Sequence, residues 1–177
     1  SENTKYFIDA LSRMPEVDMG IISQDPPDRL DHHLQGRLKA FYRIDDCLDT
    51  AQLTHAASEL TRVFGPIHRL LGPSEHIQVQ IAEAREALGI EGMDPETTRN
   101  FRDKDRMKNL WRRAGVPCAR SRAVTKPEEA WELIKQVGYP VCVKPLDGAA
   151  TQSTFRVEDD HTLGEVLRAS GPTEQRP

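Results

Sequence analysis

The feature that most constrains the fold is an alternation of short apolar runs with amphipathic helical patterns. From residue 38 onward the sequence predicts a strand, a helix, a strand and a helix, over residues 38–44, 49–65, 67–72 and 73–89. An earlier helix over 2–14 and a buried strand over 17–23 precede them. Strands that alternate with helices are typical of an α/β fold, in which a parallel sheet is covered by helices on both faces.

The composition changes at the start of the second half of the chain, where the density of charged residues rises after residue 92. Pro95 is expected to start a short helix, and residues 102–115 read as a strongly basic helix with an apolar stripe formed by Met107, Leu110, Trp111 and Ala114. The elements expected after it are a strand reached within 116–124, a helix over 126–138, strands over 139–145 and 153–159, and a helix over 161–170. We therefore predict two domains, residues 1–98 and 99–177, with a disordered tail from about residue 171.

Composition and charge exclude several classes of protein. The 177 residues carry 24 basic and 28 acidic side chains, a net charge of -4, which argues against nucleic acid as the main partner. No apolar run approaches the roughly 18 residues of a membrane span. The three cysteines are widely spaced, which suggests neither a disulfide scaffold nor a zinc site and favours a reducing, cytoplasmic setting. Cys118 and Cys142 read as small core residues.

A lysine at the end of an apolar strand is the first candidate for a functional residue. Strand alternation places Val141 and Val143 on one face, and Cys142 and Lys144 on the other. An isolated ammonium group is costly to bury, so Lys144 needs a carboxylate, solvent or a ligand phosphate. The small polar loop that follows can bring backbone N–H groups close to an anion, although it is not a Walker A loop. A surface lysine before a hairpin turn is the alternative.

A second lysine, Lys104, opens the basic helix. Cations are disfavoured at helix N-termini, so a lysine kept there for function would point outward to a ligand. The alternative is a solvated helix face of mixed charges, which the sequence DKDRMK fits well.

Taken together, two segments resemble the ATP-grasp superfamily, in its biotin-carboxylase-like and carboxylate–amine ligase branch. The segments are NFRDKDRMKNLWRRAGVPCAR, from Asn100, and AWELIKQVGYPVCVKPLDGAATQSTFRV, from Ala130. They share with the family an Asp-Lys pair that opens a helix, then Ala-Gly-Val-Pro, a helix that ends in Gly-Tyr-Pro, and a valine-rich strand before a loop of small residues. Residues 16–95 resemble, more loosely, the Rossmann-like domain that precedes the grasp fold. The fold implied is this domain followed by the first part of an ATP-grasp fold, truncated.

The resemblance implies specific roles for residues of this chain. Lys104 and Lys144 would be the two lysines that bind the nucleotide. A flexible phosphate cover would span Asp147 to Thr154, with the contacts assigned to Asp147, Gly148, Ala149, Ala150, Thr151, Ser153 and Thr154. The family is usually richer in glycine here, where this chain has Ala149 and Ala150. Glu75, expected just past a strand end, would lie near the substrate, or would be an ordinary acidic residue in the first turn of a helix.

The implied activity is ATP-dependent ligation of a small carboxylate to an amine through an acylphosphate. The Mg²⁺ ligands, the adenine clamp and the catalytic residues are expected outside this chain, because residues after Asp160 cannot supply them. The sequence thus reads as the N-terminal fragment of a ligase, inactive alone. The alternative is a degenerate grasp fold that binds a nucleotide or a partner without catalysis. Family members are often dimers, so a homodimer is one assembly that the resemblance suggests.

Other polar residues have simpler explanations. His32 and His33 are adjacent and point to different sides of a helix or strand, so ligation of one metal by both is not expected. The acidic cluster of Asp45, Asp46 and Asp49 reads as a strand end plus a helix cap. Trp111 and Trp131 lie on helix faces with apolar neighbours, where core packing is expected.

Overall fold

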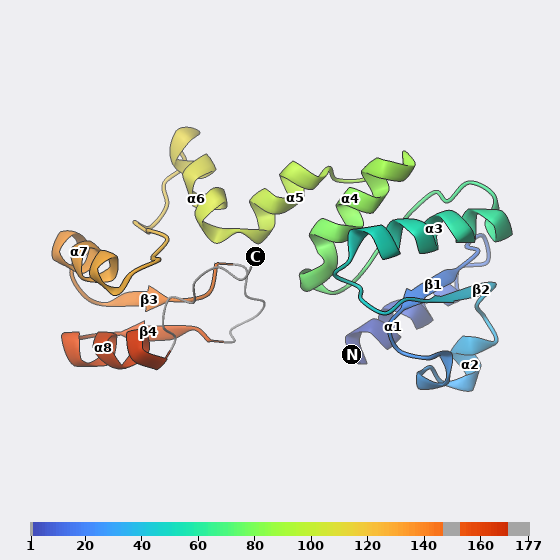
Figure 1. The fold of residues 1–177 in the computed structure, drawn as a ribbon, viewed down its shortest axis with the longest axis horizontal. Coiled ribbons are helices and arrows are strands. Elements are labelled where there is room, and N and C mark those ends of the chain that lie inside the picture. The colour runs from blue at the N-terminus through green and yellow to red at the C-terminus, as the bar shows by residue number, and fades with distance from the viewer. Residues whose placement is uncertain (1, 147–152, 170–177) are drawn as a thin grey trace. The chain divides into compact units, whose positions relative to one another are not determined.

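The structure is a computed structural model that describes residues 2–146 and 153–169 (Figure 1). The chain divides into two compact units, residues 1–99 and 100–177. No helix in the described ranges is long and apolar enough to span a membrane.

The first unit is built on two parallel strands with helices on both faces. Its elements are α1 (Glu2–Ser12), β1 (Gly20–Ser23), the 3₁₀ turn η1 (Pro27–Arg29), α2 (His32–Gln35), β2 (Ala40–Arg43), α3 (Thr50–Phe64), the 3₁₀ turn η2 (Glu75–Ile77), α4 (Gln78–Leu88) and α5 (Pro95–Arg102), which continues into the second unit. The two strands pair in parallel, with Gly20 opposite Ala40 and Ser23 opposite Arg43. The predicted parallel pairing is confirmed for these strands.

Side chains that alternate along β1 explain why both faces are covered. Ile21 packs with Ile8 of α1 and Leu34 of α2 in one cluster. Its neighbour Ile22 packs against a second cluster that contains Leu53 of α3 and Ala84 of α4. Because successive side chains of a strand point to opposite faces, one apolar pair of residues serves two separate cores.

Local signals begin and end the long helices where the sequence predicts. The Asp49 carboxylate accepts hydrogen bonds from the Ala51 and Gln52 amides, at 2.8 and 3.2 Å, and so caps α3. Gly89 has φ +65°, the left-handed conformation that glycine adopts freely, and it ends α4. Glu83 of α4 accepts a hydrogen bond from the Thr50 hydroxyl and forms an ion pair with Arg99, which ties α4 to the start of α3 and to α5.

The strand expected over residues 67–72 is wrong, since the structure has an irregular segment there. Proline flanks the segment at positions 66 and 73, and each proline lacks the N–H that a strand ladder needs. Leu70 packs against the core, whereas Leu71 is 53% exposed. The half-buried Leu70 thus holds the segment against the core without forming a strand.

The second unit is a small antiparallel hairpin covered by helices on one face. Its elements are α6 (Lys104–Arg113), α7 (Pro127–Val137), β3 (Val141–Val143), β4 (Phe155–Val157) and α8 (Asp160–Ala169). Figure 1 shows β3 and β4 side by side, and the register pairs Val141 with Val157 and Cys142 with Arg156. Val157 and Leu163 are buried in a core cluster with Ala130 and Val166, against which Trp131 also packs. The prediction that Trp131 is a core residue is confirmed.

Polar contacts fix the ends of the elements around this core. Thr125 and Lys126 donate backbone N–H groups to Glu129, and these hydrogen bonds lower the pKa of that carboxyl. The Tyr139 hydroxyl donates to Asp160 at 2.7 Å. Desolvation and this hydrogen bond to Asp160 raise the pKa of Tyr139 to about 12. The segment between α7 and β3 is thus joined to the start of α8.

The strand expected within residues 116–124 is also wrong, since that stretch is irregular. Side chains of this stretch contact helices, and one of its backbone carbonyls accepts a hydrogen bond from a helix side chain. Arg120 donates to the Gln136 carbonyl of α7 at 3.2 Å, and Arg122 pairs with Glu132 of α7 at 3.0 Å. Ser121 accepts hydrogen bonds from Arg112 of α6.

Two expectations of burial are wrong in the second unit. Trp111 and Leu110 of α6 are 40% and 41% exposed, so the apolar stripe of this helix is not covered by core residues of the described chain. Cys142 is exposed, because it lies on the face of β3 that α7 and α8 do not cover. Cys118 is half-buried.

Candidate nucleotide-binding site

The start of α6 is determined by a cap at Asp103. The Asp103 carboxylate accepts hydrogen bonds from the Asp105 and Arg106 amides, at 2.8 and 3.0 Å. These are two of the N–H groups that a helix start leaves without a partner, so the cap fixes the first residue of the helix. That residue is Lys104.

Lys104 contacts the segment that follows β3. Its backbone N–H donates to the Leu146 carbonyl at 3.2 Å, and its side-chain Nζ donates to the same carbonyl at 3.0 Å. Leu146 is two residues beyond Lys144 and is the last described residue before position 153. The structure therefore brings the start of α6 to the carboxyl end of β3, where the other predicted lysine lies.

Lys144 follows β3 directly and is exposed. Val141 and Val143 of the strand pack against the core cluster on the opposite face. The predicted alternation of faces is therefore confirmed, with Cys142 and Lys144 on the exposed side. An ammonium group at this position avoids the desolvation cost of burial and is accessible to an anion.

The loop predicted to cover the phosphates is described only at its end. Asp147, Gly148, Ala149, Ala150 and Thr151 lie outside the described residues. Ser153 and Thr154 are exposed and precede β4. Ser153 has φ +54°, a left-handed conformation that non-glycine residues adopt mainly in turns.

Glu75, the predicted substrate-binding residue, lies in the first unit. It is the first residue of η2 and is exposed. The strand whose end it was expected to follow does not form, so the argument from a strand's carboxyl end does not apply to it. A substrate contact of Glu75 therefore stays a prediction, as does the alternative of an ordinary acidic residue in the first turn of a helix.

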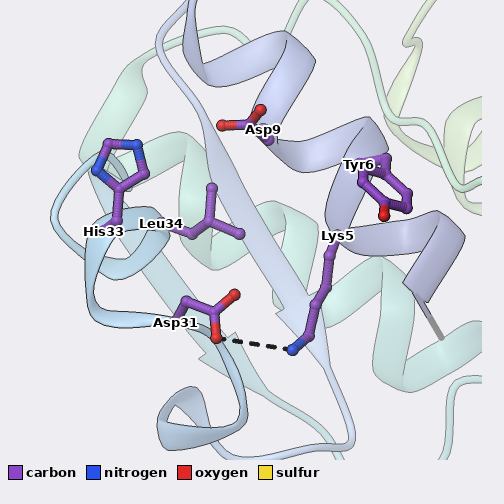
Figure 2. A pocket seen from close by; sticks show the side chains of 6 residues that line it. All are labelled: Lys5, Tyr6, Asp9, Asp31, His33 and Leu34. Atoms are coloured by element: carbon purple, nitrogen blue, oxygen red, sulfur yellow. Dashed lines mark ion pairs between the residues drawn. The ribbon is translucent and has the colours of Figure 1, made fainter.

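A surface pocket in the first unit contains neither lysine. It has a volume of about 350 Å³ and lies between α1 and α2 of the first unit, as Figure 2 shows. Lys5 and Asp31 form an ion pair at 3.7 Å within its lining. Asp9 is bound by Arg13 at 2.7 Å, and that hydrogen bond lowers the pKa of Asp9. Opposite charges in this pocket already bind one another, and no feature of it selects a ligand.

Within residues 2–146 and 153–169, no three His, Cys, Asp or Glu side chains gather in a way that could hold a metal ion.

Comparison with solved structures defines the class of fold. The L-amino acid ligase from Bacillus licheniformis matches with a TM-score of 0.74 at 18% identity, over 96% of this chain and 40% of the ligase. The biotin carboxylase domain of the Hydrogenobacter thermophilus 2-oxoglutarate carboxylase, solved as a dimer with MgADP, ADP and bicarbonate, matches with a TM-score of 0.70 at 22% identity, over 94% of this chain and 38% of that one. The fold is therefore α/β and is that of part of an ATP-grasp protein.

Sequence comparison finds similarity to a protein family over the second unit. Residues 103–173 match the family model "Carbamoyl-phosphate synthase L chain, ATP binding domain". The Methanopyrus kandleri carbamoyl phosphate synthase large chain, C-terminal section, is 30% identical over 50% of this chain and 17% of its own length. A Bacillus subtilis L-arginine-specific L-amino acid ligase is 27% identical over 73% of this chain and 31% of its own length. These matches confirm the predicted resemblance to the ATP-grasp superfamily and its carboxylate–amine ligase branch.

The matches cover only part of the length of each relative. This chain spans less than a third of the length of both curated relatives, and about two fifths of the solved structures. The family model covers both lysines, which lie 40 positions apart.

Three features close to the two lysines were not singled out from the sequence. The cap at Asp103 could have been found, because aspartate directly before a basic helical pattern is a common N-cap. The Leu146 carbonyl that binds Lys104 carries no side-chain signal. Arg156 lies opposite Cys142 on the exposed face of the hairpin, and only the register of β3 and β4 reveals that position.

Proposed function

We propose that this chain supplies part of the nucleotide-binding site of an ATP-dependent carboxylate–amine ligase that works through an acylphosphate. The observation that carries the proposal is the contact of Lys104 Nζ with the Leu146 carbonyl, at 3.0 Å, two residues beyond Lys144. Two cationic side chains that are distant in sequence thus lie at one end of the β3–β4 hairpin. The family match over residues 103–173 supports a nucleotide as their ligand.

In the proposed reaction, a carboxylate oxygen of the substrate attacks the γ-phosphorus of ATP. The bond from that phosphorus to the β–γ bridging oxygen breaks, and ADP leaves with the bonding electrons. The amine then attacks the acyl carbon, loses a proton, and displaces inorganic phosphate. The ammonium groups of Lys104 and Lys144 would bind phosphate oxygens and offset their negative charge, which is the main requirement in phosphoryl transfer.

Mg²⁺, when bound, would neutralise negative charge that develops on the phosphates. As the family resemblance implies, we propose that its ligands lie outside this chain. We likewise assign the first unit to the Rossmann-like domain and the second to the first ATP-grasp subdomain. The loop from Asp147 to Thr154 would cover the phosphates, and Glu75 would contact the substrate. The reducing, cytoplasmic setting and the homodimer remain predictions.

The alternative function is binding of a nucleotide or a partner without catalysis. Ala149 and Ala150, at positions where the family is usually richer in glycine, favour this alternative. Turnover separates the two functions for a longer polypeptide, whereas nucleotide binding is common to both.

Thermal stability in the presence of nucleotides tests the proposal directly. A ligand that binds only the folded state stabilises it by RT ln(1 + [L]/Kd), so a weak site is detectable at high concentration. We expect millimolar ATP to raise the melting temperature of the 177 residues, NAD at equal concentration to have no effect, and no ligation to occur. Equal stabilisation by both compounds, or by neither, would reject the nucleotide site. ATP-dependent ligation by this chain alone would contradict the prediction that it is inactive.

Removal of the Asp103 cap should weaken ATP binding as well as the helix. Asp103→Ala leaves two amides of α6 without their acceptor, which costs about 1 kcal/mol of stability. It also removes the carboxylate that fixes the start of the helix at Lys104. Asp49→Ala is the matched control, because Asp49 caps α3 of the first unit through the same kind of contacts. We expect similar losses of stability from both changes, measured by denaturant unfolding. Only Asp103→Ala should lower ATP affinity in a titration, and equal affinities in both variants would refute the role of the cap.

A further inference from the structure

The exposed face of the β3–β4 hairpin carries a cation that the proposed site does not yet include. Arg156 lies directly opposite Cys142 in the antiparallel register. Opposite residues of an antiparallel pair share a face, so Arg156 lies on the same side as Cys142 and Lys144. All three residues are exposed, while their neighbours Val141, Val143 and Val157 pack into the core on the other side.

The register also sets the separation between the two cations. Lys144 is two residues beyond Cys142, so it is the diagonal cross-strand neighbour of Arg156. Diagonal neighbours have Cβ atoms about 7–8 Å apart, a distance that two long side chains can bridge through one anion between their tips. Lys104 is bound at Leu146, a further two residues along the chain and beyond the end of β3. Arg156, Lys144 and Lys104 are therefore all attached at or just beyond the β3–β4 pair.

Arg156 already binds a carboxylate in the structure. Its guanidinium contacts Glu158 at 2.8 Å, and the side chains of Arg156 and Glu158 are 73% and 64% exposed. Exposed ion pairs contribute little to stability, so this one is readily exchanged for a stronger anion. A phosphate group is such an anion, because the planar fork of a guanidinium matches two phosphate oxygens at once.

We propose that Arg156 is a third cation of the nucleotide site, which exchanges Glu158 for a phosphate of the nucleotide bound at Lys144. The inference rests on the proposed function, since it requires a nucleotide at that lysine. It assigns opposite effects to two neighbouring residues. Arg156 attracts the phosphates, whereas Glu158 competes with them for Arg156.

Titration of the 177-residue chain with ATP, ADP and adenosine tests the role of Arg156. Arg156→Gln is expected to weaken ATP binding about tenfold, within the range for one charge-assisted contact, and to leave adenosine binding unchanged because adenosine has no phosphate. Arg156→Lys should recover part of the loss. Arg168→Gln is the matched control, since Arg168 is an exposed arginine of α8 in the same unit, and it should bind ATP as the unaltered chain does.

Glu158→Gln is expected to change ATP affinity in the opposite direction from Arg156→Gln. This change removes the competing carboxylate and is expected to tighten ATP binding about threefold, in line with the small worth of an exposed ion pair. In the double variant with Arg156→Gln the gain should disappear, because no guanidinium remains to be released.

The outcomes separate this inference from the proposed function. Equal losses of ATP and adenosine affinity in Arg156→Gln would show a general effect on the hairpin and overturn the inference. Unchanged ATP affinity in Arg156→Gln, together with weaker binding in Lys144→Ala, would overturn the role of Arg156 and leave the nucleotide site standing. Unchanged affinity in both variants would reject the site itself.

Discussion

Lys144→Ala is expected to weaken ATP binding by a factor between about ten and one hundred. A charge-assisted hydrogen bond is worth about 1.5–3 kcal/mol, and each 1.4 kcal/mol is tenfold in affinity. The side chain is exposed and lies on the face of β3 opposite the core, so its removal should leave the fold intact. Isothermal titration with ATP, at two salt concentrations, measures the loss and its electrostatic origin.

Lys135→Ala is the control for this change. Lys135 is an exposed lysine in the last turn of α7, within the same unit but away from the end of β3. It should bind ATP like the unaltered chain and should share with Lys144→Ala an unchanged far-UV circular dichroism spectrum. If the two variants have the same ATP affinity, Lys144 is a surface lysine and the nucleotide site is not where we place it.

Leu163→Ala is expected to destabilise the second unit by about 2–5 kcal/mol, the usual cost of a cavity left by a buried leucine. Leu163 is 1% exposed and joins α8 to Val157 and Ala130 in the core of that unit. Both tryptophans of the chain, Trp111 and Trp131, belong to this unit, so tryptophan fluorescence reports on it selectively. The midpoint of the fluorescence transition in urea should therefore fall.

Leu53→Ala is the matched change in the first unit. Leu53 is 4% exposed and lies in the core cluster under α3. It should lower the circular dichroism midpoint of the first unit and move the fluorescence midpoint less than Leu163→Ala does. Equal shifts of the fluorescence midpoint by both changes would show that the two units unfold as one and would contradict their separate cores.

The sequence was informative wherever one local rule determined an element. Helices with a clear cap or stop, such as α3 after Asp49 and α4 before Gly89, begin and end close to the predicted residues. The strands β1 and β3 were also found, because short apolar runs carry a strong signal. What these runs do not specify is a partner, and the irregular segment over residues 67–72 shows that apolar side chains alone do not make a ladder.

Burial was harder to predict than secondary structure. The stripe on α6 has the same helical spacing as the stripe on α7, yet Trp111 is 40% exposed while Trp131 packs against the core. Spacing defines a face of a helix but not the residues that cover it. Cys142 illustrates the same limit, since its exposure follows from which side of the hairpin α7 and α8 occupy.

The candidate site was predictable in its residue types and not in its geometry. Lys104 and Lys144 were identified from their positions at a helix start and a strand end and from the family resemblance. The approach of Lys104 depends on a backbone carbonyl, that of Leu146, and the position of Arg156 depends on the register of β3 and β4. A single sequence does not identify which backbone carbonyl accepts a hydrogen bond or which residues lie opposite one another across two strands.

Leu146 presents one carbonyl oxygen to two donors of the same residue, the amide and the ammonium group of Lys104. The two bonds are not equivalent, because the amide is fixed by the helix whereas the ammonium group ends a flexible four-carbon chain. The ammonium group can therefore swing to an incoming anion while the amide retains its bond. An anion that bound Lys104, as we propose, would therefore not need to separate the start of α6 from Leu146.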